Sequence, residues 1–157
     1  MICAGFNREE TENALIDLHF LGVNNLLVLR GDADKTSRRF VSEPDGHEHA
    51  CGLLKQIVEM NSGKYLDEDM EYQTPTSFSS GVAGYPEKHA EAPNLQFDLN
   101  QLKKKIDNGA EYIVTQMFFD NRRYFDFVKN CREAGIEVPI VPGLKPVSVG
   151  IFSMARD

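Results

Sequence analysis

The sequence predicts an α/β protein with parallel strands. Short apolar runs rich in β-branched residues alternate along the chain with segments of helical periodicity. No hairpin signal joins one run to the next, so each strand is expected to reach its neighbour through a helix. Two architectures share this alternation: an open doubly wound sheet, and part of a TIM (β/α)8 barrel. The chain has 157 residues and four or five predicted strands, which suits an open sheet but falls short of eight units.

Four segments have apolar residues at helical spacing, together with residues that begin or end a helix. We predict helices over residues 8–21, around 50–58, 95–108 and 121–134. The expected caps are Asn7, with Glu10 three residues later, Asn94 and Asp120, and the expected stops are Gly22, Gly109 and Gly135. The residues expected on the buried faces are Thr11, Leu15 and Leu18; Ala50, Leu53, Leu54, Ile57 and Val58; Leu95, Leu99, Leu102 and Ile106; and Tyr124, Phe127, Val128 and Cys131.

The predicted strands lie between these helices, over residues 26–29, 78–83, 112–115 and 138–141. The second strand has the weakest signal because Ser79, Ser80 and Gly81 interrupt it. Residues 1–3 are the expected stub of another strand. Two polar stretches, residues 32–46 and 61–77, are predicted to be solvated loops.

Composition narrows the class of protein. Hydrophobic residues make up 41% and charged residues 26%, as in soluble globular domains. Neither a membrane-length apolar run nor a leader peptide is evident, so a cytoplasmic protein without a membrane partner is expected. The net charge of −7 argues against a nucleic-acid surface. Cys3, Cys51 and Cys131 lack metal-site spacing, so no metal site is predicted and all three are expected in the core.

Polar or Gly/Pro-marked segments follow every predicted strand. These are Arg30-Gly31-Asp32, residues 84–89, Gln116, and residues 142–146. In α/β folds the ligand lies at the carboxyl ends of parallel strands. The four segments therefore predict a binding site on one rim of the sheet.

The residue types on this rim suit a charged, flat ligand. Arg30 can clamp a phosphate or carboxylate, and Gly31 allows close approach of the backbone. The alternative for this triplet is a surface ion pair around a tight turn. Tyr85 can stack on a heterocycle while His89 donates to a phosphate or ribose, the alternative being an ordinary turn with an exposed histidine.

The third helix adds polar residues beside the rim. Asp98, Gln101 and Lys105 share one face of it, and Lys104 precedes the last of them. The alternative is that this helix face contacts only solvent. Gln116 both donates and accepts hydrogen bonds, which suits a pterin or nicotinamide edge. No phosphate loop or dinucleotide fingerprint is present, so the residues alone predict an α/β ligand-binding rim and no particular reaction.

At these motifs the chain resembles the methylenetetrahydrofolate reductases, flavoproteins of one-carbon metabolism. The matching segments run in the family's order through nearly all of residues 1–147. They are Leu29-Arg30-Gly31-Asp32, residues 83–92, Asp98-Leu99 with residues 102–105, residues 107–110, residues 115–120 and residues 141–146.

The resemblance implies an eight-stranded barrel that binds FAD at its carboxyl rim. The family passes a hydride from NAD(P)H to the flavin and then to 5,10-methylenetetrahydrofolate, giving 5-methyltetrahydrofolate for methionine biosynthesis. By matching position, the implied FAD contacts are Arg30, Gly31, Asp32, Ala50, Ala83, Tyr85, His89, Asp98, Gln101, Lys104 and Lys105. Asp32 and Gln116 would meet the folate substrate or nicotinamide, and Asp32 would support catalysis. A homo-oligomer is compatible with the resemblance.

This chain also departs from the family pattern. It corresponds to about strands three to seven, a barrel truncated at both ends, and the strand that carries the family's general acid is not found in it. Gln101 and Lys104 stand where the family often has asparagine and arginine, and residues 148–157 form a divergent tail. Two alternatives therefore stay open: a non-catalytic remnant that at most binds flavin, and an unrelated open-sheet nucleotide-binding module.

Overall fold

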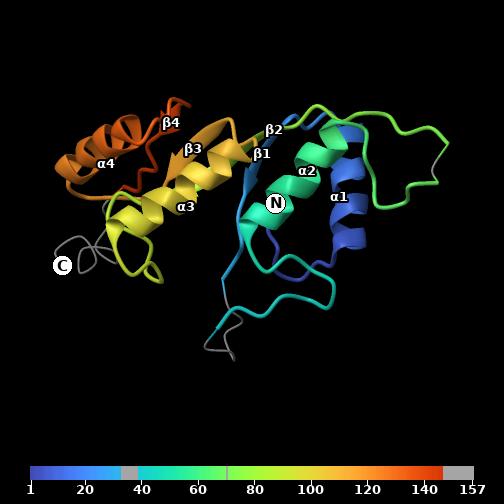
Figure 1. Cartoon of the computed structure of the whole chain (residues 1–157), viewed down its shortest axis with the longest axis horizontal. Helices are drawn as coiled ribbons and strands as arrows, with labels where there is room; N and C mark the ends of the chain where they lie inside the picture. Colours follow the sequence, from blue (N-terminus) through green and yellow to red (C-terminus); the bar gives the residue numbers. More distant parts are fainter. Residues whose placement is uncertain (33–38, 70, 147–157) are drawn as a thin grey trace.

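A computed structural model describes residues 1–32, 39–69 and 71–146. Helices and strands alternate along the chain, as the sequence predicts (Figure 1). In order, the elements are α1 (Arg8–Phe20), β1 (Asn25–Val28), α2 (Ala50–Asn61), β2 (Ser79–Gly84), α3 (Leu95–Asp107), β3 (Tyr112–Thr115), α4 (Asn121–Glu133) and β4 (Ile140–Val141).

The four strands form one parallel sheet in the order β1-β2-β3-β4, which is also their order in the chain. Val28 lies beside Val82 and Val82 beside Ile113, so these side chains form a row on one face. A doubly wound sheet reverses its strand order at a switch point, and this sheet does not. The fold is therefore an open parallel sheet of β/α units, consistent with an arc of a barrel.

All four helices contribute to one hydrophobic core on the same face as this row. The core joins the strand row to buried residues of each helix, namely Leu15 of α1, Leu53, Leu54, Ile57 and Met60 of α2, Leu99 and Leu102 of α3, and Phe127 and Cys131 of α4. On the opposite face, Leu27, Ala83 and Val114 are only half-buried. One face of the sheet is thus covered by helices, as on the outside of a (β/α)8 barrel.

Side-chain caps fix where three of the helices begin. Asn7 accepts from the backbone N–H of Glu10 at 2.9 Å, and the Glu10 carboxylate accepts from the N–H of Asn7, a complete capping box. At α3 the side chain of Asn94 accepts from the N–H of Phe97, and at α4 that of Asp120 accepts from the N–H of Arg122. These three caps are the ones predicted from the sequence.

The element boundaries differ from the prediction at several points. The last strand is limited to Ile140–Val141 because prolines on both sides lack the N–H group that continues a ladder. The first strand ends at Val28, and Leu29 instead forms a parallel bridge with Ile2, so the expected stub at residues 1–3 is a single bridge. Leu95, expected on the buried face of α3, is 43% exposed at the start of that helix.

The structure explains why Gly81 lies within β2, the strand with the weakest sequence signal. The ring of Tyr112 lies over Gly81, and its hydroxyl donates to the carbonyl oxygen of Leu26 at 2.9 Å. A Cβ added at Gly81 would lie 2.1 Å from that ring. Gly81 therefore lets one tyrosine cross β2 and tie β3 to β1.

The described parts of the two polar stretches form no helix or strand beyond Asn61, which ends α2. Among the described residues, no helix is long and apolar enough to cross a membrane. The divergent tail at residues 148–157 lies outside the described residues.

Candidate functional site

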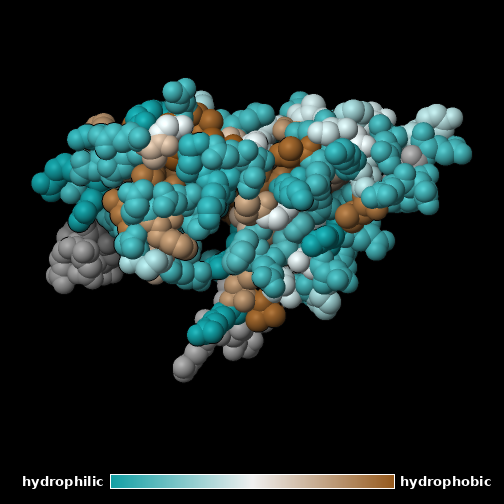
Figure 2. Space-filling view, viewed as in Figure 1, coloured by the Kyte–Doolittle hydropathy of each residue, from teal (hydrophilic) through white to brown (hydrophobic). Residues whose placement is uncertain are grey.

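A cavity of about 560 Å³ opens between α2 and α3, above the carboxyl ends of β1 and β2. Figure 2 shows a notch between the part of the surface over α3 and α4 and the part over α1 and α2. The cavity is lined by Val28, Leu29 and Arg30; His49, Ala50 and Cys51; Ala83, Tyr85, His89, Glu91 and Ala92; and Phe97, Asp98, Gln101, Lys104, Lys105, Asp107 and Asn108.

The residues proposed from the sequence to contact a cofactor converge on this cavity. Those that line it are Arg30, Ala50, Ala83, Tyr85, His89, Asp98, Gln101, Lys104 and Lys105. They come from two strand ends, two helices and the loop after β2, so only the fold brings them together. Asp98, Gln101 and Lys105 do share the face of α3 that the helical spacing predicts.

Three proposed residues lie outside the cavity lining. Gly31 has a positive φ of 91°, and a Cβ there would lie 2.9 Å from that of Ala4, so it packs against another part of the chain. Asp32 is exposed and lies two residues after Arg30 in the segment that follows β1. Gln116 is exposed and its N–H donates to the carbonyl oxygen of Gly84 at 2.8 Å. Roles for these three in ligand binding remain predictions.

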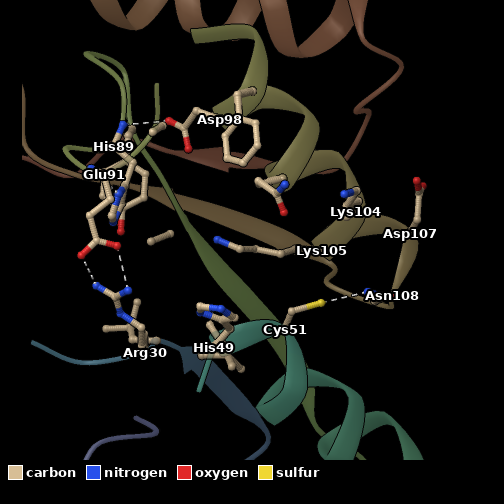
Figure 3. A pocket seen from close by; sticks show the side chains of 18 residues that line it. Arg30, His49, Cys51, His89, Glu91, Asp98, Lys104, Lys105, Asp107 and Asn108 are labelled. Atoms are coloured by element: carbon tan, nitrogen blue, oxygen red, sulfur yellow. Dashed lines mark hydrogen bonds and ion pairs between the residues drawn. The ribbon is translucent and has the colours of Figure 1, made fainter. Parts of the chain in front are cut away.

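An ion pair joins two walls of the cavity at its strand end. Both terminal nitrogens of Arg30 donate to the carboxylate of Glu91, at 2.8 and 2.9 Å (Figure 3). The hydrogen bond to Glu91 is the main cause that raises the pKa of Arg30, and the same bond lowers the pKa of Glu91. The Arg30 guanidinium also lies over the ring of Phe40, 5.2 Å from its centre. The alternative pairing of Arg30 with Asp32 around a tight turn is not formed.

Tyr85 and His89 stand together beside this pair. Their rings meet edge to face with centres 4.6 Å apart. The Nδ1 atom of His89 accepts from the N–H of Glu91 at 3.1 Å, so a neutral ring carries its proton on Nε2. Burial raises the pKa of the Tyr85 hydroxyl, with Asp98 adding to the effect. Tyr85 therefore stays protonated and available as a donor at neutral pH.

Lys105 is the most buried cation of the cavity, and its side chain reaches from α3 toward the centre (Figure 3). Burial lowers its pKa, while the carboxylate of Asp98 acts in the opposite direction. A partly desolvated ammonium interacts strongly with an anion that enters the same space. The arrangement suits a ligand that carries phosphate.

Comparison with known proteins decides the family. The family model described as methylenetetrahydrofolate reductase matches residues 1–154. This chain belongs to the methylenetetrahydrofolate reductase family. Its membership excludes the interpretation as an unrelated open-sheet module.

Curated relatives of the same name occur in distant organisms. Methylenetetrahydrofolate reductase 2 of Saccharomyces cerevisiae is 35% identical over 150 residues, covering 94% of this chain and 23% of the relative. The 5,10-methylenetetrahydrofolate reductase of Salmonella typhimurium is 34% identical over 149 residues, covering 94% of this chain and 43% of the relative. The chain thus spans less than half the length of these reductases.

A solved structure supports the fold. It is titled as an uncharacterized protein from Clostridium thermocellum that binds two copies of 5-methyl-5,6,7,8-tetrahydrofolic acid. It superposes with a TM-score of 0.51 at 15% identity, covering 94% of this chain and 43% of that one. At this identity the likeness concerns the arrangement of strands and helices.

Several residues of the cavity were not singled out as ligand contacts from the sequence: His49, Cys51, Glu91, Phe97, Asp107 and Asn108. Cys51 corrects the expectation that all three cysteines are core residues. It is half-buried at the start of α2, and its Sγ accepts from the side-chain amide of Asn108 at 3.0 Å. Cys3 and Cys131 are buried as expected, which raises both thiol pKa values to about 11.

The described residues hold no group of three or more histidine, cysteine, aspartate or glutamate side chains placed to bind a metal ion. The polar groups of the cavity are instead two histidines, amides, and cations interleaved with carboxylates. This set suits an organic ligand with phosphate and hydroxyl groups.

Proposed function

We propose that this chain forms the FAD-binding centre of a methylenetetrahydrofolate reductase. The reaction would reduce 5,10-methylenetetrahydrofolate to 5-methyltetrahydrofolate with NAD(P)H. One observation carries the proposal: nine of the eleven residues that match the family's FAD contacts, although distributed from Arg30 to Lys105, line a single cavity. Surface residues matched by chance have no reason to meet in one place.

The cavity fits the nucleotide portion of FAD in size and in chemistry. Its volume of about 560 Å³ lies in the range typical of small-molecule sites. Arg30, Lys104 and Lys105 supply positive charge for the pyrophosphate. Asp98 can accept from ribose hydroxyls, and Tyr85 and His89 can donate to polar groups of the chain that links the two rings.

Bound flavin would supply the hydride chemistry, accepting a hydride from NAD(P)H and passing it to the folate. The residues of this chain would bind and orient the cofactor. His89 would present its Nε2–H because Nδ1 is occupied by Glu91. Asp32, an exposed carboxylate at the rim, would disfavour additional negative charge on a reduced ring beside it.

Titration with flavins tests the cofactor assignment. We expect the visible spectrum of FAD to shift on adding the 157-residue chain, and riboflavin to bind about tenfold or more weakly because it lacks the phosphates. FMN, with one phosphate and no adenosine, should fall between the two. Equal affinities for FAD and riboflavin would contradict the assignment of the cavity, and no spectral shift would contradict FAD binding.

A second candidate is cofactor binding without turnover by this chain alone. The observation that favours it is the position of Asp32 and Gln116, the residues assigned to the substrate, outside the cavity lining. In addition, the sheet face opposite the helices is only half-buried, so water is not excluded there. NADH oxidation with menadione as acceptor separates the candidates: the binding-only function gives none, whereas flavin-dependent turnover by the pure chain would refute it.

A further inference from the structure

Arg30 is the cation at the end of the cavity nearest to the strands, and its guanidinium is occupied by an ion pair with Glu91. Arg30 follows β1 and Glu91 lies in the loop after β2, 61 residues later in the chain. The carboxylate receives one hydrogen bond from each terminal nitrogen of the guanidinium, at 2.8 and 2.9 Å. A phosphate group binds a guanidinium through the same pair of N–H groups. Glu91 therefore takes the position on Arg30 that a phosphate oxygen pair would use.

The Glu91 side chain is free to leave this position without disturbing its loop. It is 64% exposed, while that of Arg30 is 25% exposed. The loop is held by other contacts: the N–H of Glu91 donates to His89, and the ammonium of Lys88 donates to the carbonyl oxygens of His89 and Ala92, at 2.9 and 2.5 Å. Rotation of one exposed side chain is thus enough to release Arg30.

Arg30 has a second contact that would hold it after such a release. Its guanidinium lies over Phe40, 5.2 Å from the ring centre, and this stacking does not involve Glu91. The flat face of the guanidinium lies over Phe40, while the N–H groups at its edge donate to the Glu91 carboxylate. A ligand that replaces the carboxylate would meet an arginine already in place.

Charge also favours an exchange of anions. Among the described residues, the cavity lining holds three cations, Arg30, Lys104 and Lys105, and three carboxylates, Glu91, Asp98 and Asp107. The charges of these six side chains cancel. Departure of Glu91 leaves the lining with an excess of positive charge, which stabilises an entering diphosphate.

We propose that Glu91 is an internal counter-ion of Arg30 that competes with the phosphate of the bound nucleotide and so sets the affinity of the cavity for diphosphates. This inference rests on the proposed function. Because the pair is bidentate and partly exposed, it lowers the fraction of chains with a free Arg30 and weakens binding by that fraction.

The test compares the full chain with Glu91→Gln, using inorganic pyrophosphate and ADP as probes in calorimetric titrations. We expect Glu91→Gln to bind both probes roughly fivefold more tightly. Glu87→Gln is the matched control, since it removes the same charge from an exposed residue of the same loop outside the cavity lining, and it should leave affinity unchanged. In an Arg30→Gln background, Glu91→Gln should not increase the affinity for either probe.

Unchanged or weaker binding by Glu91→Gln overturns the proposal, because a residue that merely positions Arg30 would weaken binding when replaced. A gain that persists without Arg30 also overturns it. Thermal unfolding of each variant shows whether the chain stays folded. The flavin titration separates the two proposals: FAD binding with no effect of Glu91→Gln refutes this inference alone, whereas no binding of FAD, ADP or pyrophosphate refutes both.

Discussion

Lys105 shows, at the level of a single residue, how a proposed role in ligand binding would oppose stability. Its ammonium is largely removed from water, and burial lowers its pKa from the usual 10.5. The charged form is thus less favourable in the folded chain than in the unfolded chain. The resulting loss of stability is present in full below the lowered pKa, and it disappears as pH rises from that pKa to 10.5.

Lys105→Met should therefore stabilise the protein and weaken the site. At pH 7 we expect a higher Tm than that of the parent chain, and an affinity for ADP lower by about tenfold or more, since a charge-assisted contact to phosphate is lost. Thermal unfolding and calorimetric titration measure the two effects. The pH-dependent part of this difference in stability should vanish above pH 10.5, where the parent lysine becomes neutral in the unfolded state as well.

Lys55→Met is the matched control for this substitution. Lys55 lies on α2 with a side chain 74% exposed and pairs only weakly with Glu59, at 3.6 Å. Its replacement should change neither the affinity for ADP nor, beyond a small amount, the Tm. A Lys105→Met variant that loses stability as well as affinity would show that Lys105 supports the fold rather than the ligand.

The residues of the cavity were predictable where a local motif marked them. Arg30, Tyr85 and His89 follow strands, and helical spacing groups Asp98 with Lys105. Glu91 and Cys51 were not predictable, because their partners Arg30 and Asn108 lie 61 and 57 residues away in the chain. Contacts at such separations depend on the order of strands and the packing of helices, which local patterns do not record.

At the level of elements, the sequence predicted the type and order of the helices and strands better than their ends. Helix caps have a local signature, so the starts of α1, α3 and α4 follow from Asn7, Asn94 and Asp120. The interrupted strand β2 was the weakest prediction, because its stability depends on a residue of another strand, Tyr112, which lies over Gly81. The sequence offers no local signal for that contact.

Gly81→Ala tests this contact between elements. The added methyl group would lie 2.1 Å from the ring of Tyr112, so the ring must move and its hydrogen bond to Leu26 is lost. We expect a destabilisation of about 1–3 kcal/mol, measured by urea unfolding. If the collision is the cause, Gly81→Ala should cost much less in a Tyr112→Ala background, because the ring is then absent. An equal cost in both backgrounds would indicate a backbone effect instead.

The architecture of the whole molecule distinguishes the two folds that the alternation of helices and strands allowed. A doubly wound sheet and an arc of a barrel both predict parallel strands, and periodicity does not say on which side each helix packs. The sequential strand order and the single helix-covered face favour the arc, in agreement with family membership. The resemblance of the motifs to the family predicted the barrel architecture. Periodicity and composition alone did not distinguish it from a doubly wound sheet.

In the part of the chain that the structure describes, an open arc leaves apolar surface and strand edges available for association. Phe20 is 92% exposed, and Val141 on the edge strand β4 is 47% exposed. We expect the chain to self-associate with rising concentration, as measured by sedimentation equilibrium. Val141→Lys should shift the equilibrium toward monomer, because a charge on an edge strand opposes pairing with another edge.

Phe20→Lys is the matched comparison for the edge-strand variant. Phe20 is the last residue of α1, and α1 and β4 lie at opposite sides of the molecule in Figure 1. Restored monomer in Phe20→Lys, but not in Val141→Lys, would assign association to the helix surface and contradict the role of the edge. A chain that stays monomeric at every concentration would contradict the prediction as a whole.

The sequential order of the strands also has a consequence for how such a protein grows. Each strand pairs only with the neighbours that precede and follow it in the chain, so a further strand–helix unit could join either side without breaking an existing pair. The walls of the cavity belong to β1, α2, β2 and α3, an uninterrupted stretch of the chain. Such a scaffold could therefore be lengthened or shortened at its margins while the cavity keeps its shape.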